Sequence, residues 1–310
     1  MRVVRYYAKM DALKPFLKTL LNNPFSRQSY LAAYQDASRV VGQYLTTRYE
    51  PLMWERKSYY DSLELSHQKS NKVWFCWLQG LSEAPTIVRV CYNSLLKNLP
   101  DRDVVVIDST NWKEYVELPD YIAQKWEKKV IPPAHFADIL RLQLLIRYGG
   151  TWSDATVLCT GIMPQNEKDS LSFLNADLFL FQYTRPNSKD WEGVSNWFIS
   201  SCTNNEVLLV LRDMIFAYWK DYDCMIDYYI FHQFFSMLRA VYPETISTMP
   251  YGYSRRSIAL GYHLGDEFEE ERWNRLISKV CFHKLSYNVK SEVLKRNGNY
   301  YHAIVDMYKQ

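Results

Sequence analysis

Short apolar runs alternate with amphipathic helical patterns from residue 73 onward, and this alternation constrains the fold more than any other feature. The runs "KVWFCWLQG" (72–80) and "DVVVIDS" (103–109) are typical of strands, and a helical pattern over 84–99 separates them. Further strands are expected at 178–183 and 194–200, and further helices at 205–220 and 225–240. This order is typical of β-α-β units. We therefore predict an α/β fold with a mainly parallel central sheet.

The first 70 residues lack this alternation. They show helical patterns and end in the polar stretch "SLELSHQKSNK". We predict a helical N-terminal extension over residues 1–70 and a main domain over residues 71–310.

The N-terminal segment is also basic, because residues 1–27 carry six Lys or Arg residues and one acid. Pro15 is expected to begin a helix with Phe16, Leu17, Leu20 and Leu21 on one face. Two interpretations stay open. The face packs on the main domain, or it adsorbs to an anionic membrane surface, which attracts basic residues.

Composition excludes several classes of protein. A formal net charge of +3 is too small to indicate nucleic-acid binding. The longest apolar run, "VWFCWL" (73–78), is far shorter than the roughly 20 residues that span a bilayer. The N-terminus lacks the apolar stretch of a secretory signal. We expect a cytoplasmic protein, peripheral to the inner face of the cell membrane, whose six scattered cysteines are reduced core residues.

The helical pattern over 134–148 is apolar nearly all round, yet it carries three polar residues at three-residue spacing. His135, Asp138 and Arg141 fall on one stripe of this helix. A helical Asp138–Arg141 ion pair contributes only about 0.2 to 0.5 kcal/mol. Desolvating the two charges costs several kcal/mol each. This comparison favours a ligand-facing role for the stripe.

A Gly pair, Gly149 and Gly150, then permits a sharp turn into "TWSDATV" (151–157), an expected strand whose end exposes Asp154. Sheets of this kind bind ligands at the carboxyl ends of their strands. Trp77, Gln79 and Asp108 also lie at or just past expected strand ends. A Rossmann dehydrogenase is disfavoured, since no G-x-G-x-x-G follows the first strand.

The stretch "AHFADILRLQLLIRYGGTWSDATV" (134–157) resembles the core of the DXD-type sugar transferases. Together with "VWFCWLQG" and "NWFISS", it is similar to the bacterial capsular polysaccharide synthesis protein family, over about residues 70–290. The resemblance implies a GT-A (Rossmann-like) nucleotide-sugar transferase fold. It also implies a nucleotide-diphosphate sugar donor and a divalent metal, Mn or Mg.

The resemblance further implies roles for single residues. Asp138 and Arg141 would bind the hydroxyls and phosphate of the donor. Asp154 matches the first acid of the DXD motif, which faces the ribose and the metal, whereas Thr156 stands at the second acid and puts direct metal ligation in question.

Other residues are carried over with the flanking motifs. In "CFHKLSYN" (281–288), His283 would supply a metal or diphosphate contact, with Lys284 as a cationic aid. Trp77 would pack against the base beside Gln79, which shapes the turn. Asn196 would hydrogen-bond the sugar. Apart from the resemblance, Asp227 is the best acceptor-side candidate because it is an acid among aromatic residues on an expected helix, although an exposed helical acid is the plainer interpretation.

These observations predict a retaining hexosyltransferase of capsular or surface polysaccharide synthesis. The expected donor is UDP-galactose or UDP-glucose, and the expected acceptor is a lipid-linked oligosaccharide. The resemblance implies retention through front-side attack, because close relatives of this pattern retain the anomeric configuration and lack an obvious enzymic nucleophile. Two alternatives remain: a catalytically weak nucleotide-sugar or glycan-binding protein, on account of Thr156, and a glycoside hydrolase, which needs two carboxylates about 5 to 10 Å apart.

Overall fold

The computed structural model describes residues 2–14, 17, 27–185 and 193–309, which form two compact units. The first, here called the helical unit, comprises Met1–Leu65, Glu117–Ile139 and Glu206–Pro243. The second, here called the sheet unit, comprises Ser66–Val116, Leu140–Asn205 and Glu244–Gln310. Each unit is described by itself.

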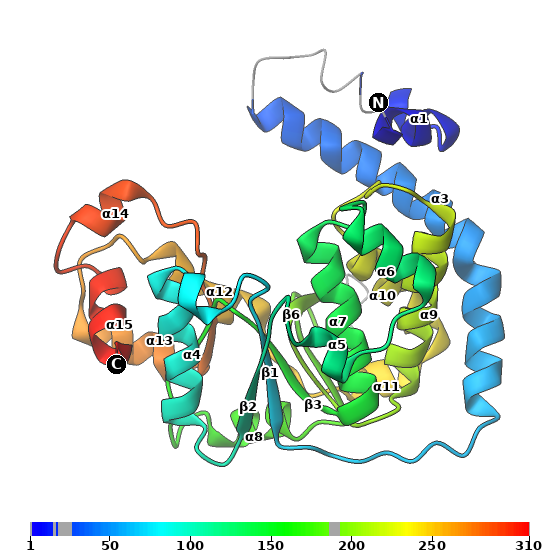
Figure 1. Ribbon diagram of the computed structural model, residues 1–310. Helices are drawn as coiled ribbons and strands as arrows, with labels where there is room; N and C mark the ends of the chain where they lie inside the picture. The colour runs from blue at the N-terminus through cyan, green and yellow to red at the C-terminus, as the bar shows by residue number, and fades with distance from the viewer. Residues whose placement is uncertain (1, 15–16, 18–26, 186–192, 310) are drawn as a thin grey trace. The chain divides into compact units, whose positions relative to one another are not determined.

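The helical unit is built around one long helix, α3 (Arg27–Asp61), which packs on α9 and α10 (Figure 1). Side-chain hydrogen bonds and ion pairs join α3 to α9. The Tyr60 hydroxyl donates to Asp213 at 2.7 Å, and Arg48 pairs with Asp221 at 2.7 Å. The remaining elements of the unit are α1 (Arg2–Lys9), α6 (Asp120–Glu127), the first half of α7 (Pro133–Tyr148), α9 (Glu206–Asp221) and α10 (Ile230–Val241).

Within the described part of the N-terminal region, the predicted helical character is confirmed over α1 and α3, whereas residues 62–70 are not helical. The predicted division at residue 70 stays a prediction, and the helix expected from Pro15 falls mostly outside the described residues. The helix predicted over 225–240 begins later, at Ile230, because the Asp227 carboxylate accepts a hydrogen bond from the Tyr229 amide at 2.6 Å and closes a turn there. Among the helices that the structure describes, none is long and apolar enough to cross a membrane.

The sheet unit contains a five-stranded sheet and a two-stranded ribbon. The order in the sheet is β2 (Asp103–Ile107), β1 (Lys72–Cys76), β3 (Gly150–Asp154), β6 (Val194–Ser201) and β5 (Leu178–Gln182). The ribbon pairs β4 (Val157–Cys159) with β7 (Phe282–Lys284). The α/β class and the four strands predicted outside the Gly-Gly motif are confirmed.

The sheet is mixed, with β6 running against the other four strands, so the prediction of a mainly parallel sheet is confirmed only in part. β1 runs parallel to β2 and β3, whereas β6 runs antiparallel to β3 and β5. The short connection between β5 and β6 explains why these two strands pair antiparallel. Only residues 183–193 join β5 to β6, and a parallel crossover needs a connection of about a dozen residues or more, usually with a helix.

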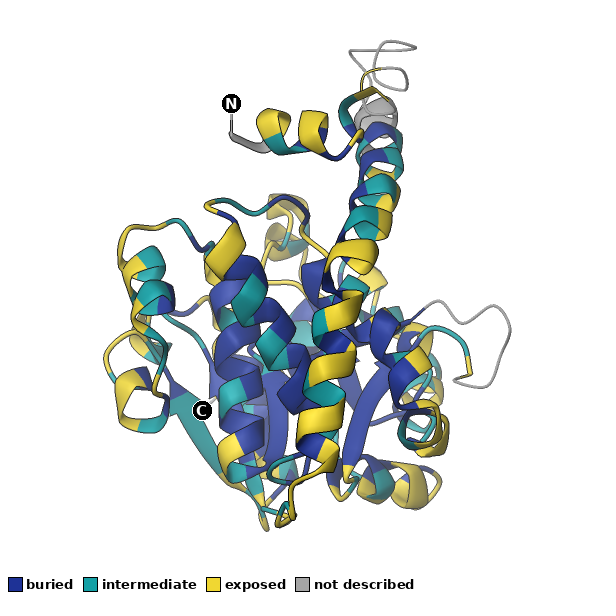
Figure 2. Ribbon diagram, turned by 90° about the vertical axis from the view of Figure 1, so that its right-hand side faces the viewer, coloured by how far each residue is buried: buried dark blue, intermediate teal, exposed yellow. Residues whose placement is uncertain are grey.

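Successive strand side chains face opposite layers, as the pleat requires. Val73 and Phe75 of β1 join one core with α4, α8, α12, α13 and α15, whereas Trp74 faces the second half of α7 and packs on Tyr148 (Figure 1). Figure 2 shows most strand residues as buried. The remaining elements are η1 (Leu81–Glu83), α4 (Thr86–Asn98), α5 (Trp112–Tyr115), α8 (Glu167–Leu174), α11 (Pro243–Thr248), α12 (Ser254–Tyr262), α13 (Glu270–Ile277), α14 (Ser291–Lys295) and α15 (Tyr300–Tyr308).

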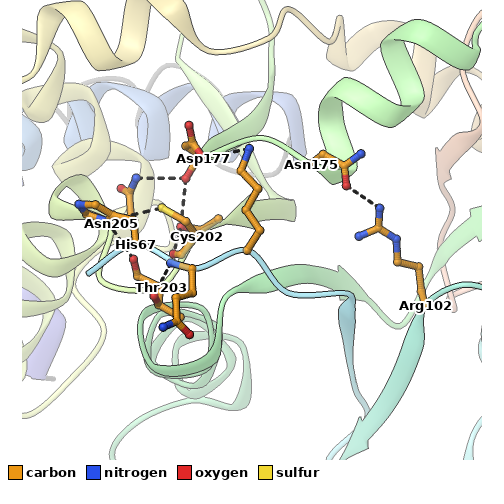
Figure 3. Close-up of polar contacts among 10 residues, drawn as sticks. His67, Arg102, Asn175, Asp177, Cys202, Thr203 and Asn205 are labelled. Carbon is orange, nitrogen blue, oxygen red and sulfur yellow. Dashed lines mark hydrogen bonds and ion pairs between the residues drawn. The ribbon is translucent and has the colours of Figure 1, made fainter. Parts of the chain in front are cut away.

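The amino end of β1 is tied to the loop that follows β6. The Gln68 amide donates to the Thr203 hydroxyl, and the Thr203 amide donates to the Gln68 carbonyl, both at 2.9 Å. Figure 3 shows His67 and Cys202 beside this junction, with Asp177 and Asn205 linked next to it. These contacts fix the end of the sheet from which β1 and β3 start.

The Gly pair serves this same end of the sheet. Gly150 has φ +93°, and a Cβ built there would lie 2.4 Å from the carbonyl oxygen of Lys72. The backbones of β1 and β3 therefore approach so closely at Gly150 that a residue with a side chain does not fit there.

We predict that Gly150→Ala lowers the free energy of unfolding by about 2 kcal/mol or more, because it combines left-handed strain with a backbone clash. Gly298→Ala is the matched control. Its φ is +77° and nothing lies within 4 Å of the added Cβ, so it costs only about 1 kcal/mol. Urea denaturation measures both, and equal effects would contradict the close approach of β1 and β3.

Candidate active site

The end of β3 places Asp154 at the carboxyl edge of the parallel strands. Asp154 pairs in register with Cys76, and Cys76 pairs with Ile107, so the chain leaves β1, β2 and β3 at one edge of the sheet. The strand predicted over 151–157 is broken here. β3 ends at Asp154, residues 155 and 156 form a turn, and β4 continues in the separate ribbon.

The ribbon brings a residue from far along the sequence to this turn. Val157 of β4 pairs with Lys284 of β7, and the Leu285 amide donates to the Thr156 carbonyl at 2.8 Å. Gly261 of α12 lies against β7, where a Cβ would come within 2.9 Å of the Lys284 carbonyl oxygen. The backbone of Lys284 is therefore held on both sides.

Asp154 is the centre of a polar cluster. Its Oδ1 accepts from Arg141 Nη2 at 3.2 Å and from Trp152 Nε1 at 2.9 Å, and its Oδ2 accepts from Lys284 Nζ at 2.8 Å. The same Nζ donates to the Thr156 hydroxyl at 2.8 Å. We call these five residues, Arg141, Trp152, Asp154, Thr156 and Lys284, the Asp154 cluster.

Trp152 is a member that the sequence prediction missed. It stands two residues before Asp154 on β3, and residues at that spacing share one face of a strand. Its ring also lies under the guanidinium of Arg141, 4.9 Å from the ring centroid. Trp152 thus orients both charged partners, and the period of two in the strand pattern was the signal for it.

Arg141 is buried, whereas the other two charges of the cluster are partly open to solvent. The exposed fraction of the side chain is 5% for Arg141 and 25% for both Asp154 and Lys284. Arg141 Nη1 also donates to the backbone carbonyl of Asn196 at 2.6 Å. Two cations and one carboxylate leave the cluster with one net positive charge.

The pKa of Asp154 reflects these neighbours. Burial alone raises it, but the nearby charges of Lys284 and Arg141, with the hydrogen bonds from Lys284 and Trp152, outweigh burial and lower the pKa below its usual value. The carboxylate is therefore ionised at neutral pH, and the cluster is suited to bind an anion.

Two other predicted residues, Trp77 and Gln79, lie in the turn after β1. Trp77 is half-buried, and its ring contacts the Tyr287 ring edge to face, with 5.5 Å between the two ring centroids. Gln79 is exposed. Asp108, after β2, accepts hydrogen bonds from the amides of Thr110 and Asn111, so it caps a local turn.

His283 lies on the face of β7 opposite Lys284, because neighbouring strand residues alternate. It is fully buried, and its Nε2 lies 3.3 Å from the Thr160 hydroxyl. Burial lowers its pKa to about 4, so the ring is neutral at physiological pH. The ribbon therefore directs Lys284, and not His283, toward Asp154.

The start of α7 belongs to the helical unit. There Asp138 is buried on the helix, and His135 Nε2 lies 3.3 Å from the Tyr228 carbonyl oxygen. Asp227 is buried and precedes α10, where the Tyr34 hydroxyl donates to it at 3.2 Å. The interpretation of Asp227 as an exposed helical acid is therefore wrong.

The donor set around Asp154 does not fit a divalent metal. Both carboxylate oxygens already face cationic donors, and the neighbouring Thr156 hydroxyl is neutral. Mg²⁺ is held by carboxylates and other oxygen ligands, and an adjacent ammonium repels it. Within the described part of the chain, no three His, Cys, Asp or Glu residues form a group that could hold a metal. The metal implied by the resemblance stays a prediction.

The model of the capsular polysaccharide synthesis protein family matches residues 18–304, and the chain therefore belongs to this family. The match begins earlier than the sequence resemblance suggested, so it includes most of the N-terminal region. Comparison with curated proteins gave no significant match. Among solved structures, the chain is similar to one titled "PaToxG Glycosyltransferase", with 12% identity, a TM-score of 0.39, and coverage of 87% of this chain and 98% of that chain.

We predict that Asp154→Asn lowers the free energy of unfolding by about 2 kcal/mol at neutral pH, since it removes a charge-assisted hydrogen-bond network. Because the pKa of Asp154 is lowered by folding, its contribution is complete above the unfolded value of about 3.9 and is lost as the pH falls through the folded value. The difference between wild type and variant should therefore shrink below about pH 4.

Asp103→Asn is the matched control, because Asp103 pairs with Lys72 at 2.7 Å but is 54% exposed. Such a surface pair contributes less than about 1 kcal/mol. Urea denaturation at several values between about pH 3 and about pH 7, a range that extends to both sides of the unfolded carboxylate pKa, measures both variants. An Asp154→Asn effect no larger than that of Asp103→Asn would contradict the tight pairing of Asp154.

Proposed function

We propose that this member of the capsular polysaccharide synthesis family is a glycosyltransferase with a GT-A fold. It moves a hexose from a nucleotide-diphosphate sugar, with UDP-galactose or UDP-glucose as the expected donor, to a lipid-linked oligosaccharide. The family match and the Asp154 cluster support this proposal.

The observation that carries the proposal is the cation pair Arg141 and Lys284 around Asp154, at the carboxyl edge of β1 and β3. Breaking the bond between an anomeric carbon and a diphosphate leaves negative charge on the leaving group. Cations that are already fixed in place stabilise that charge without reorganising during the reaction. The net positive, partly exposed cluster meets this requirement.

The aromatic pair at the same edge suits a nucleotide base. Trp77 follows Cys76, the register partner of Asp154, and Tyr287 stands three residues after Lys284. The indole Nε1 of Trp77 is buried, and no acceptor among the described residues bonds to it. We assign Trp77 to base binding, with Gln79 in the turn beside it.

The state of Asp154 bears on stereochemistry. The two carboxylate oxygens of Asp154 accept hydrogen bonds from Arg141, Trp152 and Lys284. The carboxylate is therefore a poor nucleophile, because attack on the sugar would require it to break these hydrogen bonds. We therefore propose retention through front-side attack, with Asp154 orienting groups and not forming a glycosyl intermediate. Asn196 is assigned to the sugar hydroxyls, and the role of Asp138 in binding the donor stays a prediction.

The acceptor assignment rests on the basic N-terminal segment. Six Lys or Arg residues and one acid within residues 1–27 suit a lipid diphosphate at an anionic membrane face. We therefore propose that the protein is peripheral to the inner face of the membrane.

We predict that a thermal-shift screen of nucleotide sugars identifies one donor that raises the melting temperature by a few degrees, as a ligand that binds only the folded state must. Asp154→Asn should abolish the shift, and the control Asp103→Asn should keep it. A screen in which no nucleotide sugar stabilises the protein would contradict the proposal.

Slow hydrolysis of that donor, with release of the sugar as the same anomer by NMR, would identify a retaining enzyme. Binding with no turnover in the presence of acceptor would instead favour the alternative of a catalytically weak binding protein, which the neutral Thr156 in place of an acid supports.

A further inference from the structure

The ammonium of Lys284 lies between the first and third residues of the Asp154-Ala155-Thr156 sequence. Its Nζ is 2.8 Å from Asp154 Oδ2 and 2.8 Å from Thr156 Oγ1. We propose that Lys284 is the cation of the donor site and binds the donor diphosphate directly, so that the donor binds without a divalent metal. This inference rests on the proposed glycosyltransferase function.

The hydrogen-bonding capacity of Lys284 supports a direct contact with phosphate. An ammonium group has three N–H donors. Two of them are directed to Asp154 and Thr156, and no third acceptor contacts Nζ within the ranges that the structure describes. The side chain is 25% exposed, and we infer that its third N–H can donate to a ligand.

The surroundings disfavour a metal at the same place. A divalent ion needs oxygen ligands at about 2.0 to 2.6 Å, and it would have to displace the ammonium from both Asp154 and Thr156. With Arg141 on the other carboxylate oxygen, the ion would also lie close to two positive charges, those of Arg141 and Lys284, and this charge balance opposes it. An anionic diphosphate is attracted by the same charge balance.

The position of Lys284 is fixed by backbone structure and not by the ion pair alone. The β4–β7 register and the bond from the Leu285 amide to the Thr156 carbonyl hold the two chain segments together. His283, the other cationic candidate of this motif, faces away and is neutral because burial lowers its pKa. Lys284 is thus the residue of the ribbon that is placed for this role.

The first test is calorimetric titration of the wild-type protein with UDP, and with GDP and ADP as base variants, in EDTA and then in MnCl₂. We expect the Kd for the preferred nucleotide to agree within about threefold between the two conditions. Binding only in MnCl₂ would overturn the inference but leave the proposed function intact. If none of the nucleotides binds in either condition, the proposed function itself fails.

The second test compares variants in EDTA. Lys284→Ala should weaken UDP binding by about tenfold or more, because a charge-assisted contact to phosphate is lost. The matched control is Lys72→Ala, which removes a strand lysine that also pairs with an aspartate at 2.7 Å, at the opposite end of β1. An unchanged Kd in a folded Lys284→Ala protein would overturn the inference. Circular dichroism verifies folding, and if this variant does not fold, the wild-type comparison of EDTA with MnCl₂ decides alone.

Discussion

The structure around the candidate site depends on one interaction, the carboxylate of Asp154 held between Arg141 and Lys284. A largely buried carboxylate is costly to desolvate unless it is paired and hydrogen-bonded. Here three separate parts of the sheet unit supply the compensation: α7 brings Arg141, β3 brings Trp152, and the β4–β7 ribbon brings Lys284. Gly150, where the backbones of β1 and β3 approach closely, belongs to the same arrangement, because it is the first residue of the strand that ends at Asp154.

Much of the fold was predictable because its signals are local. Apolar periodicity predicts the strands β1, β2, β5 and β6 and the helices α4, α7 and α9. The sharp turn at Gly150 is predicted by the position of the Gly pair after α7. The antiparallel pairing of β6 depends on a strand partner, and the break after Asp154 depends on Lys284, which is 130 positions away. No local pattern contains such pairings. The motif predicts that Arg141 and Asp154 lie together in one site. It does not predict the direct contact of Lys284 with Thr156.

The function that we propose follows from the charge of this cluster more than from the shape of the fold. The family establishes a link to capsular polysaccharide synthesis. Within that family, one net positive charge beside an aromatic pair suits the diphosphate and base of an activated sugar, and a carboxylate already bonded on both oxygens suits an orienting role. In this account Thr156 is not a defect in a metal site. Its hydroxyl accepts a hydrogen bond from Lys284 and, being neutral, does not offset the positive charge that attracts the donor.

The central claim is that Lys284, and not a metal ion, meets the donor diphosphate beside Asp154. A crystal structure of the protein grown with UDP and Mn²⁺, with anomalous diffraction collected at the manganese absorption edge, tests it most directly. The account predicts a phosphate oxygen within hydrogen-bond distance of Lys284 Nζ and no anomalous peak between Asp154 and Thr156. A manganese ion bound to Asp154 and bridging to the phosphates, with Lys284 displaced, would contradict it.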